Sequence, residues 1–426
     1  MPNQNKTKFK FSNSISIKLL VIFVLILLLQ IPLAFVQNLI YERQQLQSVA
    51  QSEIQKRWGE QQYVGSPSII TTRQTHDKLN NSVSKSFSIP ANSLNLKADI
   101  QAQVRYLGIY ESAIYNSDLQ LSGQFKLNSV ATQNLITNAT AVKLFVPLRE
   151  MTGLKEIKSI KINAQSYPFE PELSVSNGIY GFEIDLQNVS LTERLNYDFE
   201  FSLSGSKELN ILPQAKKNNI SMHSNWASPA FIGNHLPDTR TITNEGFDAS
   251  WTINNLVMVN KTTDQDYQSD GVFGVEIKIP ANIYQVNYRT VKYSFLIIVL
   301  TFCSFFLTEL FFKLKLHPFQ YLLIGVSLSV FYLLLLSLSE YLQFNTAFLI
   351  SSVAVITLVS GYSSVILQQR KRGLLTGLLF TVLYGFIFVL VKAEQTSLLM
   401  GSIAIWIFLA LVMYLTRKIN WYAINS

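Results

Sequence analysis

Two acidic residues stand inside otherwise apolar stretches of the chain, and they are the first candidates for chemistry. Ionisable side chains within membrane-spanning segments are costly and mark functional positions by default. Glu309 lies four residues before Lys313, so the two could form an i,i+4 pair that anchors a helix end at the membrane surface; a buried contact with another helix is the alternative. Glu340 follows Ser337 and Ser339, and these three could line a polar pocket at the outer membrane face or simply end a helix at the headgroups.

The remaining titratable residues form no catalytic or metal-binding pattern. The chain holds four histidines and one cysteine, Cys303, which excludes an intramolecular disulfide and a multi-cysteine metal site. The patterns H-E-x-x-H, G-x-S-x-G and G-x-x-x-x-G-K are absent from the sequence. His223 and His235 flank Trp226, but surface or loop positions account for most such pairs. We therefore predict a protein that is not an enzyme and that binds no cofactor and no metal.

The composition places the chain in a membrane. Hydrophobic residues make up 48% of it and charged residues only 15%, against about 25% charged in a typical soluble domain. The net charge is +8, yet residues 41–292 carry 23 basic and 24 acidic residues, so the basicity belongs to the apolar ends of the chain. This distribution is typical of membrane topology and argues against a nucleic-acid partner. The lipid bilayer is the expected partner.

Six apolar stretches are long enough to cross a bilayer, for which a helix needs about 20 residues. The first covers residues 19–40, and the others cover 293–312, 319–338, 347–367, 374–391 and 398–415. The first stretch could be a signal peptide, but no small-residue cleavage site follows it, so we expect it to be retained as a span.

The charges of the short connections predict the orientation of the spans. Lysine and arginine gather in the amino-terminal tail, in the turns after the second and fourth spans, and in the carboxy-terminal tail. Since such residues stay on the cytoplasmic side, both termini should be cytoplasmic in a bacterial inner membrane. The expected order is a cytoplasmic tail at 1–18, the first span at 19–40, a periplasmic domain at 41–292, a five-helix bundle at 293–415 and a cytoplasmic tail at 416–426.

In the region expected in the periplasm, the spacing of apolar residues changes along the chain. Residues 41–62 have helical spacing and should continue the first span as a stalk. Beyond them, apolar residues alternate with polar ones between turn-forming residues, which is typical of strands with one buried face. The expected strands cover 84–89, 119–127, 141–148, 157–162, 180–186, 197–203, 247–256 and 272–279. The predicted fold is thus a multi-pass α-helical membrane protein of six spans with an inserted, mainly-β, sandwich-like domain.

Gly373 and Gly377 open the fifth span with the spacing of small residues that lets helices approach closely. Such pairs are common by chance, so we expect contact with a neighbouring span rather than dimerisation.

Several stretches closely resemble the CreD family of bacterial inner-membrane proteins, which is named for cell-envelope integrity. They include residues 316–325 (LHPFQYLLIG), 331–340 (FYLLLLSLSE), 300–309 (LTFCSFFLTE) and 246–251 (GFDASW). The chain departs from the family's usual pattern at Tyr341, Asn420 and residues 394–397, where charged or titratable groups are lost. The resemblance implies a role in maintaining the envelope and, in some bacteria, a link to the stress response to β-lactams; it implies no catalytic residue, cofactor or substrate.

Two kinds of function remain open from the sequence. In the favoured one, the protein is not an enzyme, and the exported β domain meets an unknown envelope protein or lipid partner while the helical bundle anchors it. In the alternative, the protein transports or handles lipid through the polar region at Ser337, Ser339 and Glu340. An exported enzyme with an unfamiliar site is the least favoured reading.

Overall fold

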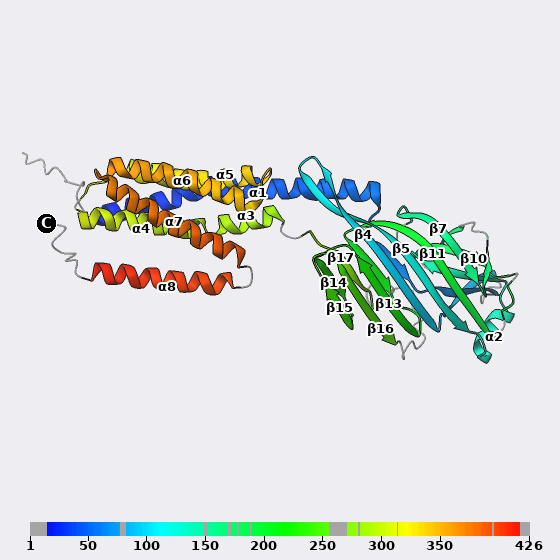
Figure 1. Ribbon diagram of the computed structural model, residues 1–426. Coiled ribbons are helices and arrows are strands. Elements are labelled where there is room, and N and C mark those ends of the chain that lie inside the picture. The colour runs from blue at the N-terminus through cyan, green and yellow to red at the C-terminus, as the bar shows by residue number, and fades with distance from the viewer. Residues whose placement is uncertain are drawn as a thin grey trace, which may run out of the picture. The chain divides into compact units, whose positions relative to one another are not determined.

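The computed structural model describes residues 15–76, 82–148, 151–167, 172–176, 179–187, 189–191, 193–254, 271–279, 282–312, 314–393 and 396–417. The chain divides into two compact units, one made of Met1–Leu46 with Ala281–Ser426 and one made of Gln47–Pro280. The first unit is helical and the second is mainly β (Figure 1).

The part of the chain that the structure describes contains six helices long and apolar enough to cross a membrane. They belong to α1 (Ile15–Trp58), α4 (Ser294–Phe312), α5 (Pro318–Ser339), α6 (Phe344–Ile366), α7 (Arg370–Lys392) and α8 (Ser397–Thr416). Each span predicted from the sequence overlaps one of these helices, and the predicted multi-pass fold with an inserted β domain is confirmed.

The start of α5 shows how the local sequence sets a helix boundary. His317 precedes the helix in an extended conformation, and its side chain accepts a hydrogen bond from the backbone N–H of Phe319 at 3.2 Å. The side chain of Gln320 in turn accepts a bond from the backbone N–H of His317 at 3.0 Å. Pro318 occupies the first helical position, where a missing N–H costs nothing. This reciprocal cap satisfies donors that the first turn otherwise leaves unpaired.

A short amphipathic helix, α3 (Ile283–Lys292), precedes α4 and is separated from it only by Tyr293. Our sequence-based boundary assigned residues up to 292 to the exported region, whereas the structure groups this helix with the helical unit. The side chain of Asn282 caps the helix by accepting from the backbone N–H of Tyr284 at 3.0 Å. The helix buries Asn287 among other residues and packs on α5 and α7.

Helix α1 ends at Trp58 rather than continuing to residue 62 as predicted. Gly59 adopts a φ of +136°, which side-chain-bearing residues rarely reach. A Cβ at this glycine would lie 2.6 Å from the carbonyl oxygen of Ser204. Glycine is the only residue type that this close approach allows. The helix therefore ends before Gly59, and strand β1 begins at Gln62.

The described strands form three sheets. The largest has the order β15 (Thr239–Ile242), β16 (Phe247–Asn254), β13 (Lys217–Ser224), β4 (Ser93–Leu107), β5 (Tyr110–Lys126), β11 (Arg194–Ser206), β7 (Leu154–Ile162) and β8 (Gln165–Ser166). The second has the order β3 (Ser82–Pro90), β2 (Ser68–His76), β6 (Ala141–Pro147), β10 (Ile179–Asp185) and β9 (Glu172–Ser176). The third has the order β1 (Gln62–Gly65), β12 (Glu208–Leu212), β17 (Phe273–Ile277) and β14 (Pro229–Gly233).

The buried faces of all three sheets contribute to one hydrophobic core. Strand β4 illustrates the alternation: Leu94, Leu96 and Ala98 are buried, whereas Lys97 and Asp99 between and after them are exposed. Each predicted strand overlaps a strand of the structure. The short helix α2 (Val130–Thr137) follows β5, and the side chain of Ser129 caps it.

Candidate functional site

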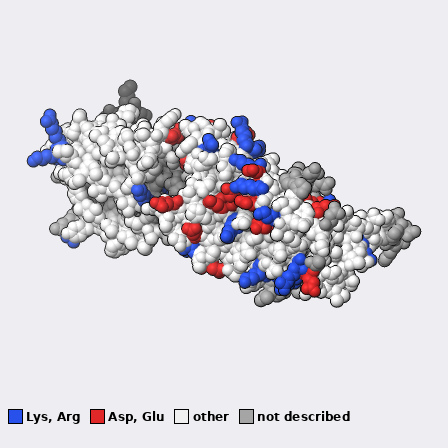
Figure 2. Space-filling model, turned by 45° about the vertical axis from the view of Figure 1, so that its right-hand side comes forward, with Lys and Arg blue, Asp and Glu red and all other residues white. Residues whose placement is uncertain are grey.

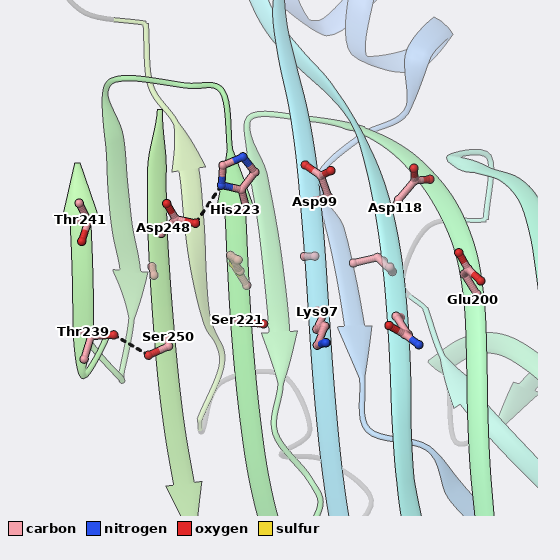
Figure 3. A pocket seen from close by; sticks show the side chains of 15 residues that line it. Lys97, Asp99, Asp118, Glu200, Ser221, His223, Thr239, Thr241, Asp248 and Ser250 are labelled. Carbon is pink, nitrogen blue, oxygen red and sulfur yellow. Dashed lines mark hydrogen bonds and ion pairs between the residues drawn. The ribbon is translucent and has the colours of Figure 1, made fainter. Parts of the chain in front are cut away.

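A pocket lies on the exposed face of the large sheet, and side chains from strands β15, β16, β13, β4, β5 and β11 line it. Figure 3 shows these side chains standing on neighbouring strands, with His223, Asp99 and Asp118 at similar heights. We call this depression the sheet-face pocket. In Figure 2, acidic and basic side chains gather on the β unit, whereas the helical unit shows a largely uncharged surface.

The strand register explains why these residues meet. His223 on β13 stands opposite Asp248 on β16 and opposite Asp99 on β4. Asp99 in turn stands opposite Asp118 on β5. Because side chains of paired residues lie on the same face of a sheet, the four form one row across four strands. Nothing in the local sequence links them, since β13 and β16 lie far along the chain from β4.

Hydrogen bonds hold parts of this row in place. The Nδ1 atom of His223 lies 2.8 Å from Oδ1 of Asp248. The Ser202 hydroxyl and the Lys158 ammonium both donate to Asp118, and in this order they lower the pKa of that carboxyl. Asp118 therefore keeps its negative charge to lower pH than an isolated aspartate. Asp99 accepts a bond from Gln101 at 3.0 Å.

A second row of polar side chains runs beside the first. Thr239 stands opposite Ser250, and their hydroxyl oxygens lie 2.7 Å apart. The same row continues through Ser221 and Lys97 to Gln120. A further depression on the same sheet includes Asn95, Ser122, Gln124, Lys161, Asn196 and Asp198 among its lining. The exposed face of the large sheet thus offers hydroxyl, amide and carboxylate groups over a wide area.

The polar side chains of the sheet-face pocket are open to solvent. The side chains of His223 and Asp248 are 59% and 71% exposed, so water screens their interaction. Among the described residues, no group of three histidine, cysteine or acidic side chains is arranged to hold a metal ion. The pocket presents the carboxylates of Asp99, Asp118, Glu200 and Asp248 to solvent. Such a surface suits a partner that carries positive charges or many hydrogen-bond donors.

Sequence analysis missed the sheet-face pocket. The sequence offers His223 as a candidate only because it lies near Trp226. The indole N–H of Trp226 donates to the backbone oxygen of Lys278 at 3.0 Å. The ring of His235 packs against Phe273 with centroids 5.9 Å apart. The structure therefore does not join the two histidines in one site. The alternation of polar residues in β4 and β13 could have located the exposed face, but not the register that sets the row.

Glu309 in α4 is buried and makes contacts with two other helices. Its carboxylate accepts a hydrogen bond from Lys18 of α1 and another from the hydroxyl of Tyr321 in α5, at 3.1 Å. It also accepts from the backbone N–H of Leu316 at 3.1 Å. The expected surface partner, Lys313, lies outside the described residues. These contacts favour the interhelical alternative for Glu309.

Ser337, Ser339 and Glu340, at the end of α5, do not converge on one pocket. Glu340 lies 3.3 Å from Nε of Arg43 in α1, and the hydroxyl of Ser339 accepts a bond from Asn287 in α3 at 2.7 Å. Ser337 is exposed on the surface of its helix. The structure thus brings Ser339 and Glu340 into contacts between helices and leaves Ser337 apart from them.

Gly373 and Gly377 pack against α6. A Cβ at Gly373 would lie 2.5 Å from Cβ of Ser364, and a Cβ at Gly377 would lie 2.6 Å from Oγ of Ser360. The two glycines of α7 therefore pack against two serines of α6 that are also four residues apart, within one chain. Close approach of two helices is what this spacing permits.

The contact with α6 leads to a first prediction. Gly373→Ala should lower the stability of the protein in detergent by about 1–3 kcal/mol, because the added methyl group overlaps Ser364. Gly385→Ala is the matched control on the same helix, since a Cβ there meets nothing within 4 Å. That variant should leave stability unchanged or raise it by up to about 1 kcal/mol. Thermal unfolding of both variants measures the difference, and equal midpoints would contradict the packing described.

Six apolar helices with a large polar β unit inserted after the first define a polytopic membrane protein with an extramembrane domain. The family model described as "Inner membrane protein CreD" matches residues 14–422. The chain is also 32% identical over 418 residues to the inner membrane protein CreD of Escherichia coli (strain K12), covering 93% of this chain and 91% of that protein. The chain belongs to the CreD family of inner membrane proteins.

Proposed function

We propose that the protein lies in the inner membrane with both termini in the cytoplasm and residues 41–292 in the periplasm. The distribution of basic residues supports this orientation, because the tails and connections assigned to the cytoplasm hold 11 of the 15 lysines and arginines of the helical unit. Alkaline phosphatase fused after Asn196 should be active, whereas the same enzyme fused after Arg372 should be inactive. The reverse pattern would overturn the orientation.

Within this orientation, the protein supports cell-envelope integrity and the response to envelope stress by binding rather than by catalysis. The observation that carries this proposal is the sheet-face pocket with its row of His223, Asp248, Asp99 and Asp118. The row is exposed and acidic, and the strand register of the large sheet positions it. The expected partner is an envelope protein or lipid whose contact surface carries cationic or hydrogen-bond-donating groups. The helical bundle anchors this binding surface in the membrane.

A double substitution in the row tests the proposal. Asp99→Asn with Asp248→Asn removes two charges and keeps the shape of both side chains. We expect at least a tenfold loss of survival under envelope stress when this variant replaces the wild-type protein in a deletion strain. Stability should change by less than about 1 kcal/mol, because exposed ion pairs contribute little. Plating efficiency and thermal unfolding measure the two effects.

The control for this experiment is Glu60→Gln with Glu193→Gln, which removes two exposed carboxylates outside the sheet-face pocket. It should complement like the wild type. A photo-crosslinking amino acid at Gln120, inside the pocket, should capture the partner in living cells, and the double aspartate variant should reduce that product. Full complementation by the double aspartate variant would refute the role of the row.

The transport alternative rests on Ser337, Ser339 and Glu340 and receives less support. A transport site needs side chains that converge on a shared space, whereas Ser337 is exposed and Glu340 contacts Arg43. Glu340→Gln keeps a hydrogen-bonding group beside Arg43, so we expect it to complement the deletion strain nearly fully. Complete loss of complementation by a folded Glu340→Gln protein would favour transport over anchoring.

A further inference from the structure

Three buried hydroxyl groups of the helical unit have no hydrogen-bond partner among the described residues. They belong to Tyr332 of α5, Ser351 of α6 and Tyr384 of α7. Many other hydroxyls of the spanning helices donate to a backbone carbonyl one turn earlier, as Ser352 does to Leu349 at 2.9 Å. Such a bond satisfies a hydroxyl within its own helix. Ser351, the direct neighbour of Ser352, does not make it.

The three hydroxyls lie at the same level of the helical unit. Tyr332 lies seven residues before the end of α5, Ser351 lies seven residues after the start of α6, and Tyr384 lies eight residues before the end of α7. Turns of only a few residues join these helices, and α6 packs on both α5 and α7. Consecutive helices therefore run in opposite directions. At 1.5 Å per residue, each of the three residues lies roughly 10–12 Å from the same end of the helices.

Aromatic contacts confirm that the three residues share one part of the core. The ring of Phe331 lies 5.4 Å from that of Phe348 and 4.5 Å from that of Tyr384. Ser351 follows Phe348 by one turn on the same face of α6. The phenol groups of Tyr332 and Tyr384 are close enough to interact electrostatically. Tyr332, Ser351 and Tyr384 are at most 2% exposed, so neither lipid nor bulk water reaches them.

We propose that the hydroxyls of Tyr332, Ser351 and Tyr384 bind ordered water inside the helical bundle. A hydroxyl that is buried without a partner is destabilising, and buried groups of this kind are usually paired with protein or with water. A buried water makes about three hydrogen bonds, and each hydroxyl can both donate and accept. The bundle would then hold hydrogen-bonded water at the depth of the hydrocarbon, in addition to anchoring the β unit. This inference is independent of the sheet-face pocket.

The sign of a stability change tests the water site. Tyr332→Phe and Tyr384→Phe each remove only a hydroxyl, so each should lower the thermal unfolding midpoint of the full-length protein in detergent by about 2–4 °C. The double variant should lose less than the sum of the two, because both hydroxyls act on shared water. A hydroxyl that truly lacks a partner would give the opposite sign, since its removal relieves the cost of its burial. Unchanged or raised midpoints in both variants would overturn the proposal.

Radiolytic footprinting detects the water directly, because an X-ray pulse converts bound water into hydroxyl radicals that modify adjacent side chains. Modification of Tyr332 and Tyr384 should exceed that of Tyr321 at least fivefold. Tyr321 is the matched reference, since it is 1% exposed in the same helix bundle and its hydroxyl donates directly to Glu309. Equal modification of all three tyrosines would contradict bound water at the site.

A pair of serine variants assigns the labelling to this site. Ser351→Ala removes one of the three proposed ligands and should lower the modification of Tyr332 and Tyr384 at least twofold. Ser352→Ala is the matched control, because its hydroxyl bonds within its own helix, and it should leave the modification unchanged. The same effect in both variants would overturn the role of Ser351.

Discussion

Replacing Glu309 with alanine should destabilise the helical unit by about 3–5 kcal/mol, the largest effect we expect from a single polar residue of the protein. The carboxylate is 9% exposed and accepts bonds from Lys18, Tyr321 and the backbone of Leu316. Its removal leaves the tyrosine hydroxyl and the backbone N–H without their acceptor in a low-dielectric interior, and it separates α1 from α4 and α5. Unfolding of the full-length protein in mild detergent, followed by heat or by titrated denaturing detergent, measures the loss.

The two partners of this ion pair should respond differently. Lys18 is 26% exposed, so its ammonium group can reach water when the pair is broken, and Lys18→Ala should cost less than Glu309→Ala. Because the two changes remove one shared interaction, the double variant should lose less stability than the two single losses together. Equal losses in the single variants, or strict additivity, would contradict a buried role for Glu309. Glu309→Gln should retain part of the stability by keeping an acceptor.

The second large effect concerns Trp251, whose replacement by alanine should cost about 3–5 kcal/mol in the β unit. Trp251 is 1% exposed in β16 of the large sheet. Its ring lies 5.8 Å from Phe231 of β14 and 5.3 Å from Phe273 of β17, both in the four-stranded sheet. The indole also donates to the backbone oxygen of His235 at 3.2 Å. Its loss therefore leaves a cavity where two sheets meet.

Hydrogen exchange of the full-length protein localises this effect. Trp251→Ala should speed exchange in β14, β16 and β17 before it does so in β2 and β3, which belong to another sheet. Trp251→Phe keeps an aromatic ring and loses the indole donor, so it should cost less, with about 1 kcal/mol from the hydrogen bond. Uniform acceleration across the β unit in Trp251→Ala would mean that this contact does not hold the sheets together locally.

Much of the fold follows from patterns within short windows of sequence. Apolar stretches of about 20 residues predict the six spans because a bilayer of fixed thickness demands that length. Alternation predicts strands such as β5 and β11. The same alternation runs through β4, where Leu94, Leu96, Ala98 and Ile100 are buried, although β4 is not among the strands expected from the sequence. The short strands β1, β14 and β15 offer too few residues for a period-two pattern to emerge.

Contacts between distant segments could not be predicted in this way. Glu309 pairs with Lys18, which lies 291 residues earlier in the chain and which no helical spacing could have pointed to. The row of the sheet-face pocket depends on the register of β13 with β4 and β16, which only the packed structure fixes. The glycines of α7 could be recognised as a contact surface, but their serine partners on α6 could not.

Strand β1 is synthesised long before β12, the strand with which it pairs. It lies at one edge of its sheet and pairs in parallel with β12, so that Gln62 meets Leu209; its other contact of this kind among the described residues is one isolated antiparallel bridge, Val64 with Leu148. Ribosomes add about 5–20 residues per second, so β1 waits on the order of ten seconds or more for its neighbour to be made. During that time it is an open template for pairing with another molecule. Nascent chains of this protein should therefore need protection by chaperones until the late strands emerge.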